Sequence, residues 1–262
     1  MQLHVIDAFC DGPFSGNPAA VCLVREKVSD RWMQRLAGEM NLSETAFLEK
    51  REQGWGLRWF TPRVEVDLCG HATLAAAHFL YVGGLADPSK GIDFHTRSGV
   101  LRALPAGGGI ELCFPRIPVA EVATPVALAP ALGQTPVATF VGADDLIVEL
   151  ADEARVRAVT PDLALLAQLP YRCVAVTARG AHHDFVSRVF GPRVGIPEDP
   201  ATGSTHCALG PLWAARLGKT DLVAFQASSR GAELHVHLED DGCHLVGRCA
   251  TVLRGEVAAD AL

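Results

Sequence analysis

Two stretches of the chain share one order: an acidic residue in a strand-like run, a glycine turn, and a helix-like run of small residues. They are EVDLCGHATLAAAHFL, residues 65–80, and EDPATGSTHCALGPLW, residues 198–213. Aligning Gly70 with Gly203 places CGHATLAA over TGSTHCAL. A helix rich in Ala and Thr can lie inside a curved sheet that would exclude larger side chains. The repeat therefore predicts two similar halves, each a β-rich unit around one central helix.

The sequence between the two repeats predicts where the chain divides into domains. A Pro-rich segment, residues 115–133, is the best boundary, because the strand pattern restarts after it. We therefore expect domains at residues 1–117 and 118–262. The predicted fold class is α+β, with two pseudo-symmetric domains, each a curved or barrel-like, mostly antiparallel sheet around a central helix.

Capping residues and periodicity predict the helices. Ser29 is a suitable N-cap for the first of them, and Asn41 lies near its C-terminus. The predicted helices cover residues 29–41, 71–84, 160–170 and 204–218. The remaining patterned segments, including residues 154–159, are expected to be strands.

Composition limits the partners and the compartment. The formal net charge of −7 repels phosphate backbones, so nucleic acid is not an expected partner. No apolar run reaches the roughly 18 residues that a membrane span needs, and the opening residues MQLHVIDAF lack the pattern of a secretion signal. We therefore expect a cytoplasmic protein with no membrane partner, whose eight cysteines are reduced and mostly buried.

The two glycine turns are candidate anion sites. Each opens a helix, where free backbone N–H groups and the positive end of the helix dipole favour a carboxylate or phosphate. If the halves face each other, both turns address one small anionic substrate. The alternative is that Gly70 and Gly203 only start two well-capped helices.

Several longer motifs carry a family resemblance that runs nearly end to end. They are FSGNPAAV (14–21), NLSETAF (41–47), RWFTPRVEVDLCGHATLAAAH (58–78), DFVSRVFGP (184–192), GIPEDPATGSTHCAL (195–209) and QASSRGAELHV (226–236). With these motifs the chain resembles the phenazine-biosynthesis isomerase (PhzF-like) family, within the diaminopimelate epimerase-like fold. The resemblance implies an active site in the cleft between two pseudo-symmetric domains, a homodimer, and isomerisation by proton transfer on a small carboxylic acid without cofactor or metal.

The resemblance also implies roles for seven residues. The family's catalytic residues fall on Glu44, His71 and Asp199. Its substrate-binding positions fall on Asn17, Gly70, Gly203 and Ser204. Glu44 is the expected general acid/base, since a closed apolar cleft raises a carboxyl pKa toward neutrality. His71, in the first turn of its helix, is expected to be neutral and to act as a hydrogen-bond donor or proton relay.

Other interpretations remain open at this point. Glu44 can be a solvated loop acid, His71 a satisfied buried histidine, and Asp199 a helix-capping aspartate. An amino-acid racemase or epimerase using Cys69 with Glu44 is one alternative, although Thr202 occupies the second turn where a second thiol would be. A non-catalytic small-molecule binding protein is the other.

Metal and nucleotide chemistry have no support in the sequence. The histidines of HVH, residues 235–237, lack a third ligand at metal spacing. No phosphate-binding glycine loop, dinucleotide-binding fingerprint or serine-hydrolase elbow occurs.

Overall fold

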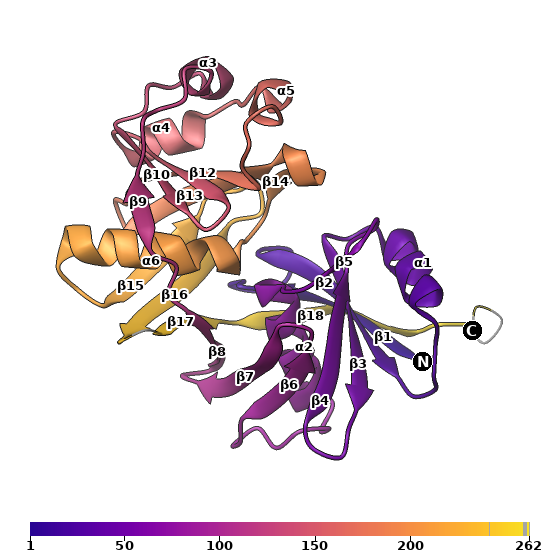
Figure 1. The fold of residues 1–262 in the computed structure, drawn as a ribbon. Coiled ribbons are helices and arrows are strands. Elements are labelled where there is room, and N and C mark those ends of the chain that lie inside the picture. The colour runs from indigo at the N-terminus through magenta and orange to yellow at the C-terminus, as the bar shows by residue number, and fades with distance from the viewer. Residues whose placement is uncertain (241, 259–260, 262) are drawn as a thin grey trace. The chain divides into compact units, whose positions relative to one another are not determined.

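The chain forms two compact units (Figure 1). The computed structural model describes residues 1–240, 242–258 and 261. The first unit contains Met1–Cys113 and Val246–Leu262, and the second contains Phe114–Leu245. This division differs from the predicted domains 1–117 and 118–262, because the C-terminal strand returns to the first unit and pairs there with the N-terminal strand.

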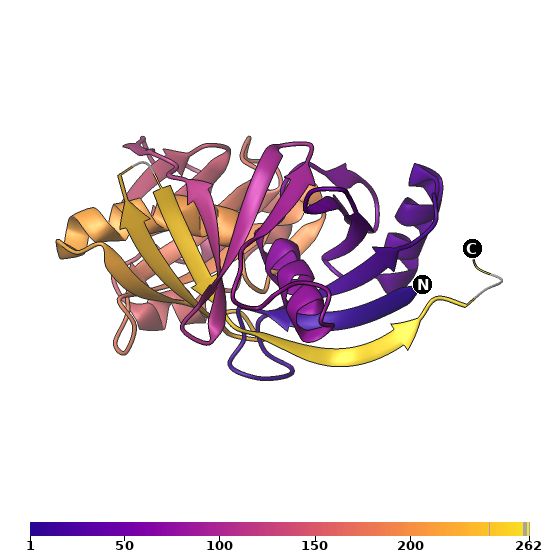
Figure 2. The same ribbon diagram turned by 90° about the horizontal axis from the view of Figure 1, so that it is seen from below.

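The first unit is a largely antiparallel sheet with one helix inside it. Its strands are β1 (Gln2–Ala8), β2 (Asn17–Val24), β3 (Glu44–Lys50), β4 (Trp55–Phe60), β5 (Glu65–Val66), β6 (Ile92–Thr96), β7 (Gly99–Ala106), β8 (Gly109–Pro115) and β18 (Cys249–Glu256). The strand β1 lies antiparallel between β18 and β2, β2 runs parallel to β3, and β4 runs parallel to β6. Figure 2 shows the yellow β18 running beside the indigo β1.

The two helices of this unit follow from the local sequence. Helix α1 (Asp30–Met40) is capped by Ser29, whose Oγ accepts a hydrogen bond from the Trp32 N–H, and it ends at Asn41 with φ of 49°. Helix α2 (Gly70–Val82) is buried on nearly all sides, with ten of its thirteen residues in the core. Its alanines allow β1, β2 and β3 to pack closely around it.

The second unit repeats this plan. Its strands are β9 (Val119–Glu121), β10 (Ala138–Gly142), β11 (Asp145–Glu149), β12 (Cys173–Arg179), β13 (Phe185–Gly191), β14 (Ile196–Asp199), β15 (Asp221–Gln226), β16 (Ala232–Glu239) and β17 (Gly242–Gly247). Its helices are α3 (Leu128–Leu132), α4 (Glu153–Ala158), α5 (Leu163–Leu166) and α6 (Gly203–Leu217), with a 3₁₀ turn η1 (Pro192–Val194). The pairs β11–β12 and β13–β15 are parallel, as β2–β3 and β4–β6 are in the first unit.

This shared order confirms the predicted internal repeat. Helix α6 takes the place of α2 and packs against β15 and β16. At Gly210 an added Cβ would lie 2.7 Å from the Cγ1 atom of Val236, so the close approach of helix and strand requires glycine there. The mixed, mostly antiparallel sheets around two central helices are those of an α+β fold.

Two local predictions for the second unit are wrong. Residues 154–159, predicted as a strand, lie mostly in α4, because the Asp152 carboxylate caps the Arg155 N–H at 2.8 Å and Val156 turns into the core. The helix predicted over 160–170 shortens to the single turn of α5. The Pro-rich segment predicted as the boundary directly follows the division after Cys113, and it contains β9 and α3.

The cysteines agree with the sequence expectation. Six of the eight are buried, as predicted for most of them. Within the part of the chain that the structure describes, no helix combines the length and the apolar character needed to cross a membrane.

Candidate active site

In the first unit, polar residues meet where two parallel strands begin. Asn17 is the first residue of β2 and Glu44 the first of β3, and the parallel register pairs Ala19 with Glu44. Gly16, with φ of 67°, sets the start of β2, because a Cβ there would lie 2.2 Å from the Ala8 carbonyl oxygen. Both polar side chains are buried, Asn17 fully and Glu44 with 8% of the residue exposed. His71, the second residue of α2, lies beside them.

The imidazole of His71 is the centre of this cluster. Its Nδ1 atom lies 3.2 Å from the Asn17 Nδ2 atom and 3.5 Å from the Cys69 Sγ atom. Its Nε2 atom lies 3.2 Å from the Glu44 Oε2 atom. The structure therefore brings together four residues that the sequence singled out, although Glu44 and His71 come from different elements.

Burial makes this imidazole neutral. Desolvation lowers the pKa of His71 to about 3, because the charged form loses its hydration. With the amide of Asn17 oriented as in the structure, its Nδ2 donates to Nδ1, so the proton of the neutral ring sits on Nε2, facing Glu44. The 3.2 Å separation from Glu44 is a close contact rather than a directed hydrogen bond, since Nε2 has no hydrogen-bond partner of good geometry among the described residues.

The groups in this cluster are suited to proton transfer. A buried carboxylate can take and return a proton, and a neutral histidine N–H beside it can stabilise negative charge without competing for that proton. The structure agrees with the prediction that His71 is neutral. The cause, however, is burial of the imidazole and not its position at the helix N-terminus.

The second glycine turn is braced by a network inside its own unit. The Asp199 Oδ2 atom accepts a hydrogen bond from the Thr202 hydroxyl at 2.6 Å. Gln226, fully buried, accepts from the Thr202 N–H at 2.8 Å and donates to the Asp199 carbonyl at 2.7 Å. Gly203 and Ser204 then open α6. A catalytic role for Asp199 stays a prediction.

Sequence reasoning did not single out Gln226, Asp145 or Arg172. Asp145 is the first residue of β11, as Asn17 is of β2, and it pairs with Arg172, which also contacts Ser204. The signal available was the strand repeat, because Asp145 and Asn17 hold the same place in it. Because Asp145, Arg172 and Ser204 are far apart in the sequence, no local pattern predicted that they are in contact.

Among the described residues, one group of side chains can hold a metal ion. Ligand atoms of Glu44, Cys69 and His71 lie within 4.8 Å of one another. The sequence predicted no metal site, and spacing along the chain does not reveal this one. A thiol, an imidazole and a carboxylate suit zinc, but Asn17 already donates to the Nδ1 atom of His71, and Nε2 faces Glu44. Metal binding would therefore compete with these existing contacts of His71.

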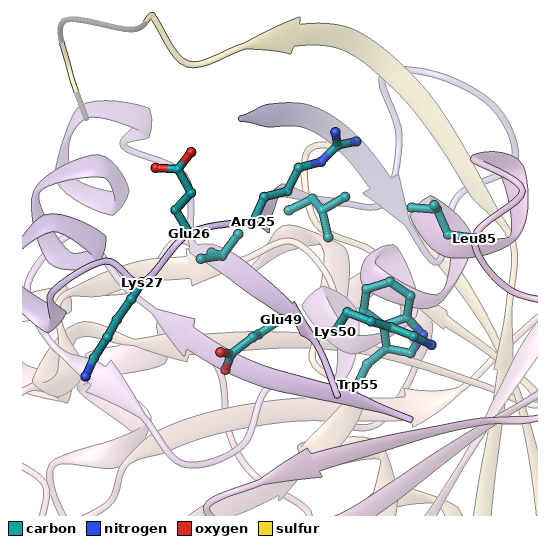
Figure 3. Close-up of a pocket in the computed structure, with 9 residues that line it drawn as sticks. Arg25, Glu26, Lys27, Glu49, Lys50, Trp55 and Leu85 are labelled. Atoms are coloured by element: carbon teal, nitrogen blue, oxygen red, sulfur yellow. The ribbon is translucent and has the colours of Figure 1, made fainter. Parts of the chain in front are cut away.

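A groove lies at the other end of β3. It has a volume of about 530 Å³ and is lined by Lys50, Trp55, Leu85 and residues at the end of β2 (Figure 3). The Lys50 ammonium lies over the Trp55 ring, 4.5 Å from its centre. Glu44 begins β3 and Lys50 ends it, so this groove is about 20 Å from the buried cluster. Its mixed charges, Arg25 and Lys27 beside Glu26 and Glu49, define no ligand chemistry.

Known proteins share both the sequence and the fold. A family model described as "Phenazine biosynthesis-like protein" matches residues 6–255. A protein of Halalkalibacterium halodurans, named an uncharacterized isomerase, is 46% identical over 260 residues, covering 97% of each chain. The crystal structure of a PhzF-family phenazine biosynthesis protein from Enterococcus faecalis superposes with a TM-score of 0.94 at 38% identity, covering 98% of each chain.

A more distant structure shows how widely the architecture occurs. A probable proline racemase from Agrobacterium radiobacter shares the fold with a TM-score of 0.67 at 14% identity, covering 99% of this chain and 93% of its own. Together the fold and the relatives define an isomerase with an epimerase-like architecture. The chain belongs to the phenazine biosynthesis-like (PhzF) family.

Proposed function

We propose that this isomerase moves a proton on a small, cyclic or unsaturated carboxylic acid, with Glu44 as the general acid/base. The observation that carries the proposal is the buried carboxylate of Glu44, 3.2 Å from the neutral imidazole of His71. A base for carbon-bound protons must be shielded from water. Glu44, buried in the first unit, meets this condition.

The other predicted residues take supporting roles in this proposal. Asn17 holds His71 in the Nε2–H tautomer, so that its N–H can stabilise the negative charge that develops as the proton leaves carbon. The turns at Gly70 and Gly203 anchor the substrate carboxylate through backbone N–H groups, and Asp199 assists proton transfer. The residues present can carry the reaction as acid, base and hydrogen-bond donors, which is why we propose it without a cofactor.

A second candidate function rests on the thiol of Cys69. Its Sγ atom lies 3.5 Å from the Nδ1 atom of His71, at the N-cap of α2, where a thiolate is favoured. An amino-acid racemase or epimerase using Cys69 with Glu44 is compatible with this contact. Thr202 at the equivalent place of the second turn removes the pair of thiols that two-thiol chemistry requires.

Hydrogen exchange in D₂O tests the proposed role of Glu44. A panel of small cyclic and unsaturated carboxylic acids is incubated with the protein, and deuterium in each acid is measured by mass spectrometry and NMR. For acids that the wild type labels or isomerises, Glu44→Gln should reduce the rate by about 10²–10⁴-fold, the usual contribution of a general acid–base group. Glu49→Gln, an exposed carboxylate on the same strand, is the matched control and should keep the wild-type rate.

The stereochemical course separates the two candidate functions. One carboxylate that removes and returns a proton works on one face of the substrate and retains part of a specific label. Inversion at one carbon with complete uptake of solvent deuterium would support the epimerase. Wild-type rates in Glu44→Gln would exclude Glu44 from either mechanism.

A further inference from the structure

The second unit places a guanidinium beside the first turn of its central helix. Arg172 immediately precedes β12, and its Nε and Nη2 atoms donate to the two carboxylate oxygens of Asp145 at 2.9 and 2.6 Å. Asp145 is buried, and its Oδ2 also accepts from the Thr205 hydroxyl at 2.7 Å. The Nη2 atom of Arg172 donates in addition to the Ser204 Oγ atom at 3.1 Å. A bidentate pair anchored in the core thus fixes the plane of the guanidinium.

This arrangement leaves hydrogen-bond donors without acceptors. Both protons of Nη2 are used, one on Asp145 and one on Ser204. The Nη1 atom makes no hydrogen bond to any residue within the described ranges, and the Arg172 side chain is 41% exposed. The Oγ atom of Ser204 accepts the hydrogen bond from Arg172. Its own hydroxyl proton makes no hydrogen bond to the described residues. Two adjacent side chains thus offer hydrogen-bond donors. Such donors suit a carboxylate, because an ionised carboxylate only accepts hydrogen bonds.

Arg172 and Asp145 lie where a parallel strand pair begins, as the polar residues of the first unit also do. Asp145 and Asn17 each begin the first strand of a parallel pair. Glu44 begins the second strand of its pair, and Arg172 directly precedes the second strand of the other. The second unit therefore carries a guanidinium that donates hydrogen bonds where its parallel strand pair begins.

We propose that Arg172, together with Ser204, binds the carboxylate group of the substrate. The inference rests on the proposed function, which it deepens by naming a specificity-determining residue for the acid. Asp145 positions the guanidinium, and the free Nη1 donors and the Ser204 hydroxyl face the ligand. The site accepts a planar anion with two oxygens and discriminates against the corresponding amide, which offers only one acceptor oxygen.

Binding of benzoate and of its neutral isostere benzamide tests this residue. Isothermal titration calorimetry should show benzoate binding to the wild type at least about tenfold more tightly than benzamide. Arg172→Met, which keeps the length of the stem, should weaken benzoate binding by about tenfold or more, as loss of a charge-assisted hydrogen bond does. Ser204→Ala should weaken it less, because it removes one neutral donor.

A matched control is available at the C-terminal ends of α6 and β11, whose first residues include Ser204 and Asp145. Arg216 pairs with Glu149, and its side chain is 40% exposed, against 41% for Arg172. Arg216→Met should leave benzoate affinity unchanged. Because Arg172→Met leaves the buried charge of Asp145 alone, the double variant Arg172→Met/Asp145→Asn is measured beside it, and it should show the same loss of benzoate binding with its fold retained.

The outcomes separate this inference from the proposed function. Undiminished benzoate affinity in the folded double variant overturns the role of Arg172, as does wild-type protein that fails to bind benzoate or binds benzamide equally well. Glu44→Gln should keep benzoate affinity while losing hydrogen exchange. If hydrogen exchange depends on Glu44 but benzoate binding does not depend on Arg172, the proposed function stands and this inference fails.

Discussion

Two buried histidines should make the fold sensitive to mild acid. Burial lowers the pKa of His71 to about 3 and that of His206 to about 4, from an ordinary value of 6.5. His206 is fully buried in α6, and its Nδ1 donates to the Thr202 carbonyl oxygen at 2.8 Å. Because both pKa values are lowered on folding, the unfolded chain takes up protons first as the pH falls. Stability is therefore complete above about pH 6.5 and declines below it.

The size of the effect follows from the difference between the pH and the ordinary pKa of histidine. At pH 5 the folded protein holds both imidazoles neutral, while the unfolded chain is 1.5 pH units below their ordinary pKa of 6.5. Each pH unit is worth about 1.4 kcal/mol per proton. Each histidine therefore lowers the free energy of unfolding by about 2 kcal/mol between pH 8 and pH 5, and the two together by about 4 kcal/mol.

Substitution isolates these contributions from those of the carboxyl groups. Urea unfolding at pH 8 and pH 5 is compared for wild type, His71→Gln and His206→Gln. Each variant loses stability at both pH values, but its loss between pH 8 and pH 5 should be smaller than that of the wild type by about 2 kcal/mol. An identical pH dependence in variant and wild type would refute the argument, because it would mean that the histidine is protonated equally in the folded and unfolded states.

Three further predictions address the thiol, metals and assembly. Cys69→Ser should lower stability modestly and keep hydrogen exchange within about tenfold of wild type; complete loss in a folded variant would identify Cys69 as a catalytic thiolate. EDTA dialysis should leave the activity intact, whereas added Zn²⁺ should inhibit it by occupying Glu44 and His71; a stoichiometric metal required for turnover would contradict the first part. We also propose a homodimer, so light scattering should give twice the 27.9 kDa of one chain, and a monomer at micromolar concentration would exclude it.

Local signals in the sequence were sufficient for the central elements of each unit. Ser29 and Asn41 set the ends of α1, since a cap depends on hydrogen bonds within a few residues. The runs of Ala, Thr and Gly after Gly70 and Gly203 predicted helices buried within sheets, and α2 and α6 are such helices. The repeat also predicted the pseudo-symmetric plan, because the same local pattern must bury its apolar surface in the same way.

Pairing between distant strands was decided only by the tertiary structure. The strand β18 reads like any other C-terminal strand, and its return to β1 depends on edges that no local pattern reveals. Residues 154–159 have a pattern compatible with a strand, and the cap at Asp152 and the packing of Val156 against the core made them a helix.

The candidate site shows the same limit. The sequence named Glu44 and His71, but only the parallel register of β2 and β3 beside α2 places their atoms 3.2 Å apart. Arg172 could not be identified from the sequence, because its role depends on contacts with Asp145 and Ser204 that form only when the chain folds. Residue types determined which chemistry was possible, and the long-range pairing of strands determined which groups meet to carry it out, since contacts between distant segments exist only once the chain has folded.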